Sequence, residues 1–163
     1  MPNVETRTPA NTPKPIGPYS HIAKVGTSIA IGGVAGIAPD TGELASMEIA
    51  GQTRQVLANL EALLTSVNSD LRHVIHVNVF LLHIKDFEEM NRVYAECMGG
   101  HLPARTVIGV NGLPKAGALL TMNLTAVSKD LEERRLAAER LWSLAKSSLT
   151  RALVLCEPFR HCS

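Results

Sequence analysis

Two segments with helical periodicity, each standing between segments of strand character, constrain the fold of this chain most strongly. From Met47 to Val67, apolar residues recur at intervals of three and four, the period of an amphipathic helix. A second stripe runs from Asp86 to Met98 and stops at Gly99-Gly100, a pair suited to a C-terminal cap. Between them, His73 to Leu82 is apolar and β-branched, as in a largely buried strand. The pattern predicts helices packed on a sheet.

The remaining strand candidates lie before and after these helices. Residues 22–37 contain two strand-like pieces that are separated by Gly26-Thr27, which predicts a hairpin. Arg105 to Val110 and Leu119 to Val127 are the last two candidates. Residues 3–18 are rich in Pro, Thr and Asn and are interpreted as an extended arm. The predicted order is two strands, helix, strand, helix, two strands, an α+β domain.

The composition changes after Lys129-Asp130. The sequence then becomes rich in Leu, Ala, Arg and Glu, with a helical apolar stripe formed by Leu131, Ala138, Leu141, Trp142, Ala145 and Leu149. We therefore expect a first domain over residues 1–130 and an extra C-terminal helical extension over residues 131–163. Simple packing of this helix is the first expectation, ahead of binding a partner helix.

Composition also limits the classes of partner. A formal net charge of +1 and an aromatic content of 4% argue against binding to nucleic acid, which needs concentrated Lys and Arg or stacking platforms. No apolar run reaches the roughly 20 residues of a membrane-spanning helix. The N-terminal residues are charged and proline-rich, unlike a secretory leader, and the three cysteines form no CxxC pair. A cytoplasmic protein is expected.

Arg105 is the first candidate for a functional side chain. It stands at the start of a strand candidate, after Pro103-Ala104, where an inward-pointing guanidinium would need a partner. Its planar fork of donors suits the carboxylate of a small organic acid. The alternative is a strand-end arginine in an ordinary surface ion pair, and the local sequence by itself favours that alternative.

The other motifs are weaker evidence for a functional site than Arg105. The run GGVAG has neither the spacing GxGxxG nor the Lys-Ser/Thr ending of a phosphate loop, so it indicates tight sheet packing first. Tyr19 is either a hydroxyl donor or an aromatic plug. His73 and His76, three apart on an expected strand, would point to opposite faces, and no HExxH or acidic cluster occurs. No metal and no organic cofactor is expected.

Several segments, taken in order, carry a resemblance to a known family. They are IGPY from Ile16, IGG from Ile31, PDTGE from Pro39, QTRQVLANLEALL in the first helix, and PARTVIGVNGLPK from Pro103. Together with the closing LTAVSK they are similar to the Rid (reactive intermediate deaminase) family, also called YjgF, over about residues 10 to 129. The segment beginning with PAR is the most specific of them.

This resemblance implies a chorismate-mutase-like fold, a mixed sheet packed by two helices, that assembles as a homotrimer with ligand clefts between subunits. It also implies that Arg105 binds the carboxylate of a 2-imino or 2-enamino acid. By the same resemblance Tyr19 lines the cleft, Gly33 offers a backbone contact, and Asn91 matches an asparagine of the family's second helix.

Three positions depart from the family pattern. An alignment from the closing TAV places Asn123 where the family has a water-orienting glutamate, Gly32 where a serine is usual, and Val107 in place of a common cysteine. Asparagine positions water but cannot accept its proton at neutral pH. The leading hypothesis is a deaminase that hydrolyses reactive imines to 2-oxo acids and ammonia, with Arg105, Asn123 and Tyr19 acting on the substrate. The alternative is a non-catalytic trimer that binds small carboxylates as a sensor or partner-binding module.

Overall fold

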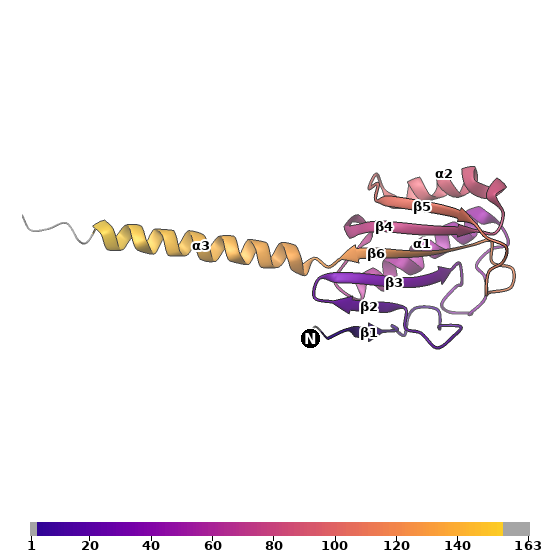
Figure 1. Ribbon diagram of the computed structural model, residues 1–163, viewed down its shortest axis with the longest axis horizontal. Coiled ribbons are helices and arrows are strands. Elements are labelled where there is room, and N and C mark those ends of the chain that lie inside the picture. The colour runs from indigo at the N-terminus through magenta and orange to yellow at the C-terminus, as the bar shows by residue number, and fades with distance from the viewer. Residues whose placement is uncertain (1–2, 155–163) are drawn as a thin grey trace, which may run out of the picture. The chain divides into compact units, whose positions relative to one another are not determined.

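The computed structural model describes residues 3–154, except for the side chains of residues 131–133, 145 and 147–154. The compact unit Met1–Lys129 contains one six-stranded sheet with the order β1-β2-β3-β6-β4-β5 (Figure 1). Its strands are β1 (Glu5–Arg7), β2 (Ile22–Val25), β3 (Ser28–Ala35), β4 (Val74–Leu81), β5 (Ala104–Gly109) and β6 (Leu120–Val127).

The sheet is mixed, as the family resemblance implies. Only β4 and β5 pair in parallel, and every other pair of neighbours is antiparallel. A parallel pair needs a crossover connection, which α2 (Phe87–Met98) supplies between β4 and β5. The expected hairpin of β2 and β3 is confirmed, and Gly26 turns the chain at a φ of +58°, which favours glycine.

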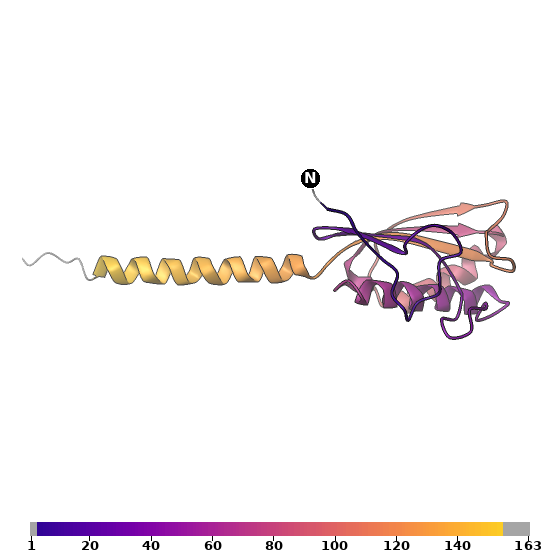
Figure 2. The same ribbon diagram turned by 90° about the horizontal axis from the view of Figure 1, so that it is seen from below.

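Both predicted helices are confirmed and lie on one face of the sheet (Figure 2). The first, α1 (Ile49–Thr65), packs against β3, β6 and α2. The second, α2, ends at Gly99 with a φ of +59°, the left-handed cap that its glycine pair predicts. Two 3-10 turns, η1 (Leu71–His73) and η2 (Ile84–Asp86), precede β4 and α2. The core between the helices and the sheet includes Val56, Leu60, Leu63, Leu64, Val79, Leu81, Met90, Leu120 and Met122.

One short strand differs from the sequence interpretation. Residues 3–18 are expected as an arm, but Glu5–Arg7 forms β1 and pairs antiparallel with β2 at the edge of the sheet. All three side chains of β1 are exposed, so the segment has no alternation of apolar and polar residues. Its strand conformation comes from backbone hydrogen bonding to β2, which the local sequence does not encode.

Two polar contacts lie on the face of the sheet opposite the helices, between β4 and its neighbours β5 and β6. Asn78 donates from Nδ2 to Oδ1 of Asn123 at 2.8 Å, and His76 Nε2 lies 3.2 Å from Oγ1 of Thr106. Phe80 lies on the same face and is half-buried. Within the unit Met1–Lys129, neither helix covers this face, as Figure 2 shows.

The C-terminal helix α3 runs from Asp130 to Val154 and confirms the helix expected there. Leu141 and Trp142 of the predicted apolar stripe are exposed, and Lys146 Nζ lies 5.3 Å from the Trp142 ring centroid. The side chains of Leu131, Ala145 and Leu149 lie outside the described ones. None of the helices in residues 3–154 combines the length and apolarity that a membrane crossing requires.

Candidate functional site

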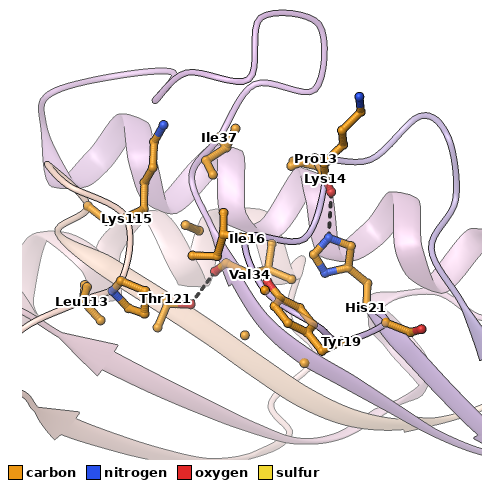
Figure 3. Close-up of a pocket in the computed structure, with 17 residues that line it drawn as sticks. Pro13, Lys14, Ile16, Tyr19, His21, Val34, Ile37, Leu113, Lys115 and Thr121 are labelled. Atoms are coloured by element: carbon orange, nitrogen blue, oxygen red, sulfur yellow. Dashed lines mark hydrogen bonds between the residues drawn. The ribbon is translucent and has the colours of Figure 1, made fainter.

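A cavity of about 610 Å³ lies beside β3 in the compact unit (Figure 3). Three segments wall it: residues 13–21 of the N-terminal arm, residues 32–37 at the end of β3, and residues 113–121 leading into β6. Most of the wall is apolar, from proline, glycine and aliphatic side chains. Polar side chains are few, which is the usual composition of a small-molecule site.

A β-bulge in β3 shapes the floor of this cavity. The register between β3 and β6 shifts between Ile31 and Val34, so Gly32 and Gly33 fall within the irregular stretch. A Cβ on Gly33 would stand 3.4 Å from Oγ1 of Thr121, an ordinary van der Waals contact, so the Thr121 hydroxyl lies directly beside this glycine. The Thr121 hydroxyl donates to the carbonyl oxygen of Val34 at 2.9 Å. The bulge therefore leaves backbone and the oxygen of Thr121 exposed to a ligand.

Tyr19 and His21, the last aromatic residues of the arm segment 13–21, form one side of the cavity. Tyr19 is 42% exposed, and its ring meets the His21 ring edge-on, with 5.6 Å between centroids. His21 is buried, and its Nε2 lies 2.7 Å from the carbonyl oxygen of Pro13. The backbone N–H of Gly32 donates to the carbonyl of His21 at 2.9 Å, which ties the arm to β3.

Gln52 of α1 fixes the loop on the opposite side of the cavity. Its side chain is fully buried, and Nε2 donates to the carbonyl oxygens of Ser46 and Gly117, each at 3.0 Å. Its Oε1 accepts the backbone N–H of Leu119 at 2.8 Å. Because one buried amide satisfies three backbone groups, the segment that carries Lys115 and Thr121 is held against the helix.

Arg105 lies on β5, at the opposite edge of the sheet. Its guanidinium carbon stands 4.7 Å above the ring centroid of Tyr94 in α2, a cation–π arrangement. Arg105 forms no ion pair within the described part of the chain. The donor fork of Arg105 therefore has no carboxylate partner among the described residues, where the local sequence favours a surface ion pair.

Helix α2 carries two polar groups without a partner, one of them on Tyr94. The hydroxyl of Tyr94 and Oδ1 of Asn91 are both buried, and neither has a hydrogen-bond partner among the described residues. Burial raises the pKa of the Tyr94 hydroxyl, while the positive charge of Arg105 acts in the lowering direction. Val107, two residues after Arg105, is partly buried and packs against the core. Arg105 and Val107 therefore belong to β5 and Asn91 and Tyr94 to α2, and the contact of Arg105 with Tyr94 joins the two elements.

The chain thus carries two separate groups of candidate residues. Tyr19, Gly32 and Gly33 line the cavity beside β3, whereas Arg105 belongs to β5. Strands β6 and β4 lie between β3 and β5 in the sheet. With neighbouring strands about 4.8 Å apart, the two groups are separated by roughly 14 Å. A molecule the size of a small 2-imino acid cannot touch both groups of one chain.

Comparison with known proteins identifies the family. The family model described as Endoribonuclease L-PSP matches residues 9–128, most of the compact unit. The chain belongs to the Rid/YjgF family. The predicted resemblance is confirmed.

Named relatives of this Rid protein include enzymes and proteins with only a family name. A RutC family protein of Pyrococcus horikoshii is 48% identical over 105 residues, which is 64% of this chain and 83% of that protein. The human 2-iminobutanoate/2-iminopropanoate deaminase is 33% identical over 122 residues, 75% of this chain and 88% of the human protein. The Escherichia coli TdcF structure with bound serine matches with a TM-score of 0.71 at 27% identity, covering 76% of this chain and 98% of TdcF. The mixed α+β fold is that of Rid structures.

Asn123 does not line the cavity of this Rid protein. Its carboxamide accepts the hydrogen bond from Asn78, while Thr121, two residues earlier, lines the cavity. Both side chains stand on the same side of β6 because alternate residues of a strand share a face. Because it shares this face and lines the cavity, Thr121 is a second candidate for a contact with the ligand. The role of Asn123 in catalysis stays a prediction.

The sequence interpretation did not include Thr121 in the site, and it did not include Tyr94 either. Its spacing from Phe87, Met90 and Val93 puts it on the apolar stripe of α2, where an aromatic side chain is expected in the core. The guanidinium of Arg105 lies over the ring only because β5 runs beside α2 in the folded chain.

Within the described residues, no group of three or more His, Cys, Asp or Glu side chains is arranged to hold a metal ion.

Proposed function

We propose that this Rid protein is a 2-imino/2-enamino acid deaminase whose sites form between the subunits of a homotrimer with a chorismate-mutase-like fold. In this proposal the protein works in the cytoplasm, without a metal or organic cofactor. The proposal rests on the surroundings of Arg105. Its guanidinium lies over an aromatic ring and has no ion pair among the described residues, so it is available for a ligand's carboxylate.

The separation of the two residue groups supports a site made from two subunits. Arg105 of one subunit would bind the carboxylate, and the cavity with Tyr19, Gly33 and Thr121 of its neighbour would receive the rest of the ligand. The sheet face with the Asn78–Asn123 and His76–Thr106 contacts, uncovered by α1 and α2, is our candidate for the contact between subunits. The serine bound in TdcF, itself a small carboxylic acid, is consistent with such a ligand.

The reaction needs only water and a positioned imine. The oxygen of water adds to the imine carbon, and its proton passes to the nitrogen. The hydroxyl proton of the resulting carbinolamine passes to the amino nitrogen as the C–N bond breaks, which releases ammonia and leaves the 2-oxo acid. The Thr121 hydroxyl donates to Val34, so its oxygen lone pairs remain able to accept a hydrogen bond from this water. No carboxylate of the described cavity wall acts as a base, so positioning provides the acceleration.

Release of ammonia from freshly generated 2-iminopropanoate and 2-iminobutanoate tests this proposal. We expect Arg105→Ala to lower kcat/KM about 100-fold or more, since two charged hydrogen bonds to the carboxylate are lost. Arg54→Ala is the matched control, because Arg54 instead pairs with Glu96 on the surface. Equal ammonia release by Arg105→Ala and the unaltered protein would contradict the anchor role.

A non-catalytic carboxylate-binding trimer is the second candidate. It is favoured by the absence of a carboxylate at Asn123, where the family has its glutamate, and at Thr121, which lines the cavity on the same face of β6. Thr121→Glu and Asn123→Glu separate the candidates. The binding module would be favoured if the unaltered protein binds 2-oxobutanoate but does not hydrolyse imines, and if either variant gains a large imine-hydrolysing activity. Activity of the unaltered protein would favour the enzyme.

A further inference from the structure

Helix α3 exposes large apolar side chains that the proposed reaction does not use. Leu141, Trp142 and Leu144 are 68%, 66% and 66% exposed. The two alanines shortly before them, Ala137 and Ala138, are exposed as well. Single apolar residues scattered over a surface are ordinary, but a contiguous apolar patch marks a site of interaction.

Helix geometry puts these five residues on one side of α3. Successive residues turn by about 100° around the helix axis, so Leu144, Leu141 and Trp142 span an arc of roughly 160°. The two alanines fall within the same arc, whereas Leu136 lies outside it, about 140° from Leu141. The apolar face of α3 consists of Ala137, Ala138, Leu141, Trp142 and Leu144.

Two cations border the apolar face, one at each edge. Arg140 follows about 40° beyond Leu144, and Lys146 follows about 40° beyond Trp142. Lys146 Nζ lies 5.3 Å from the ring centroid of Trp142. Long basic side chains in such positions extend their alkyl stems along an apolar surface and keep their charged ends in the polar layer above it.

The charges of α3 are divided along its length. The acidic residues of the helix all precede Arg140, and the sequence from Arg140 to Val154 contains three basic residues and no acidic one. This division also suits the helix dipole, which favours anions near the first turn and cations near the last. The dipole explains the charges, but it gives no reason for exposed leucine and tryptophan beside them.

An amphipathic helix of this kind suits a lipid surface. Such a helix lies in the plane of an anionic bilayer, with its apolar face in the acyl boundary and its basic residues among the headgroups. Tryptophan is the residue that prefers the level of the headgroups, and Trp142 stands at the border of the apolar face, next to Lys146. An acidic groove on a protein would also match the charges, but the tryptophan at the border favours the bilayer.

We propose that the apolar face of α3 binds the surface of an anionic lipid bilayer, with Arg140 and Lys146 among the lipid headgroups. The helix lies on the bilayer and does not cross it. This binding is independent of the proposed deaminase, because none of the residues that line the cavity belongs to α3 and Arg105 lies on β5.

Fluorescence of the full chain tests the proposal, because Trp142 is the one tryptophan of the sequence and reports on this face directly. The chain is titrated with vesicles of phosphatidylcholine, alone or mixed in equal parts with phosphatidylglycerol. We expect the emission to move to shorter wavelength on binding. The mixed vesicles should bind at least about tenfold more tightly, because each cation near an anionic surface adds to the affinity.

Two matched variants separate the apolar face from the rest of the helix. Leu141→Gln should weaken binding to the mixed vesicles about tenfold, because the leucine no longer enters the apolar layer. Leu136→Gln is the control, since it makes the same exchange outside the apolar face, and it should bind like the unaltered protein. Circular dichroism checks that both variants keep the helix.

Three results would overturn the proposal. They are an emission that neither kind of vesicle changes, equal affinity for the two kinds of vesicle, and equal binding by the two variants. An emission already at short wavelength without vesicles, and unchanged by them, would place the apolar face against protein. Ammonia release does not enter these measurements, so loss of lipid binding and loss of deaminase activity are told apart.

Discussion

At the scale of single residues, Tyr94 links the core to the candidate ligand anchor. Its ring fills the space between α2 and β5 and is 5% exposed, while one face of the ring supports the guanidinium of Arg105. Its hydroxyl is buried without a partner among the described residues. The ring therefore packs in the core and orients Arg105. The hydroxyl makes no such contact with the described residues of its own chain.

Two substitutions at Tyr94 separate ring from hydroxyl. We expect Tyr94→Phe to leave the free energy of unfolding unchanged or to raise it by up to about 1–3 kcal/mol, because an unsatisfied buried hydroxyl is removed. Tyr94→Leu removes the cation–π contact as well, and we expect it to weaken 2-oxobutanoate binding by about 0.5–2 kcal/mol. Urea unfolding and calorimetry measure the two effects. A clear loss of stability in Tyr94→Phe would mean that the hydroxyl has a partner in the assembled protein.

At the scale of elements, Asp70 ties η1 to the end of β6. It lies before η1, where Oδ1 accepts from the backbone N–H of Arg72 and contacts Nδ1 of His73 at 2.7 Å. Its Oδ2 accepts from Nη2 of Arg72 and pairs with Nζ of Lys129, just after β6, at 3.0 Å. Burial raises the pKa of this carboxyl, but the hydrogen bonds outweigh burial and hold the pKa well below its ordinary value of 3.8.

This depressed pKa makes part of the stability depend on pH. A carboxyl with a lower pKa in the folded state stabilises the fold above its unfolded pKa and loses that contribution as pH falls toward the folded value. We expect Asp70→Asn to cost about 2–3 kcal/mol at pH 7, and the difference from the unaltered protein to shrink as pH falls below 3.8. Urea unfolding from pH 7 to pH 2.5 checks this. A difference that stays constant over the range would assign the loss to packing.

The contact of β3 with α1 is the second feature at this scale. Just after β3, a Cβ on Gly36 would stand 2.8 Å from the carbonyl oxygen and 2.9 Å from the Cα of Gln52. Both atoms are backbone, so neither can yield like a flexible side chain. The closeness of strand and helix positions Gln52 for its bonds to the loop beside the cavity.

Substitution by alanine tests this closeness. We expect Gly36→Ala to lower the free energy of unfolding by about 1–3 kcal/mol, since the added methyl group forces the strand away from the helix. Gly112→Ala is the matched control, because nothing lies within 4 Å of its added Cβ, and we expect a change below about 1 kcal/mol. Equal stability of the two variants would show that the strand moves at no cost.

At the scale of the whole molecule, the chain divides after Lys129. The backbone N–H of Lys129 donates to the carbonyl of Asn68, and that of Ser128 donates to Thr27, so the end of β6 is tied into the compact unit. The core lies wholly within Met1–Lys129. The compact unit therefore contains the packing that it needs to fold.

Truncation after Lys129 tests this division. We expect the shortened chain to unfold at the same urea concentration as the full chain and to retain 2-oxobutanoate binding, because the core, the cavity and Arg105 all remain. Light scattering on both forms should give the mass of three chains, as the proposed site between subunits requires. Loss of trimers in the shortened form alone would assign assembly to the residues after Lys129.

Much of this architecture could be predicted from the sequence, for reasons that are local. The apolar period of α1, the Gly99 cap of α2 and the Gly26 turn each act within a few residues, so their patterns predict these elements directly. Arg105 stands out for the same reason, since it is a charged residue at the start of an apolar strand. The family pattern adds Tyr19 and Gly33, and both line the cavity.

Tertiary structure decided the rest, because the deciding contacts join distant parts of the chain. β1 is a strand only because β2 pairs with it, and Arg105 lies over Tyr94 only because β5 runs beside α2. The register of β6 against β3 puts Thr121 into the cavity wall, while Asn123 pairs with Asn78. Local sequence determines periodicity and turns, whereas pairing and register depend on the free energy of the whole sheet, to which every strand contributes.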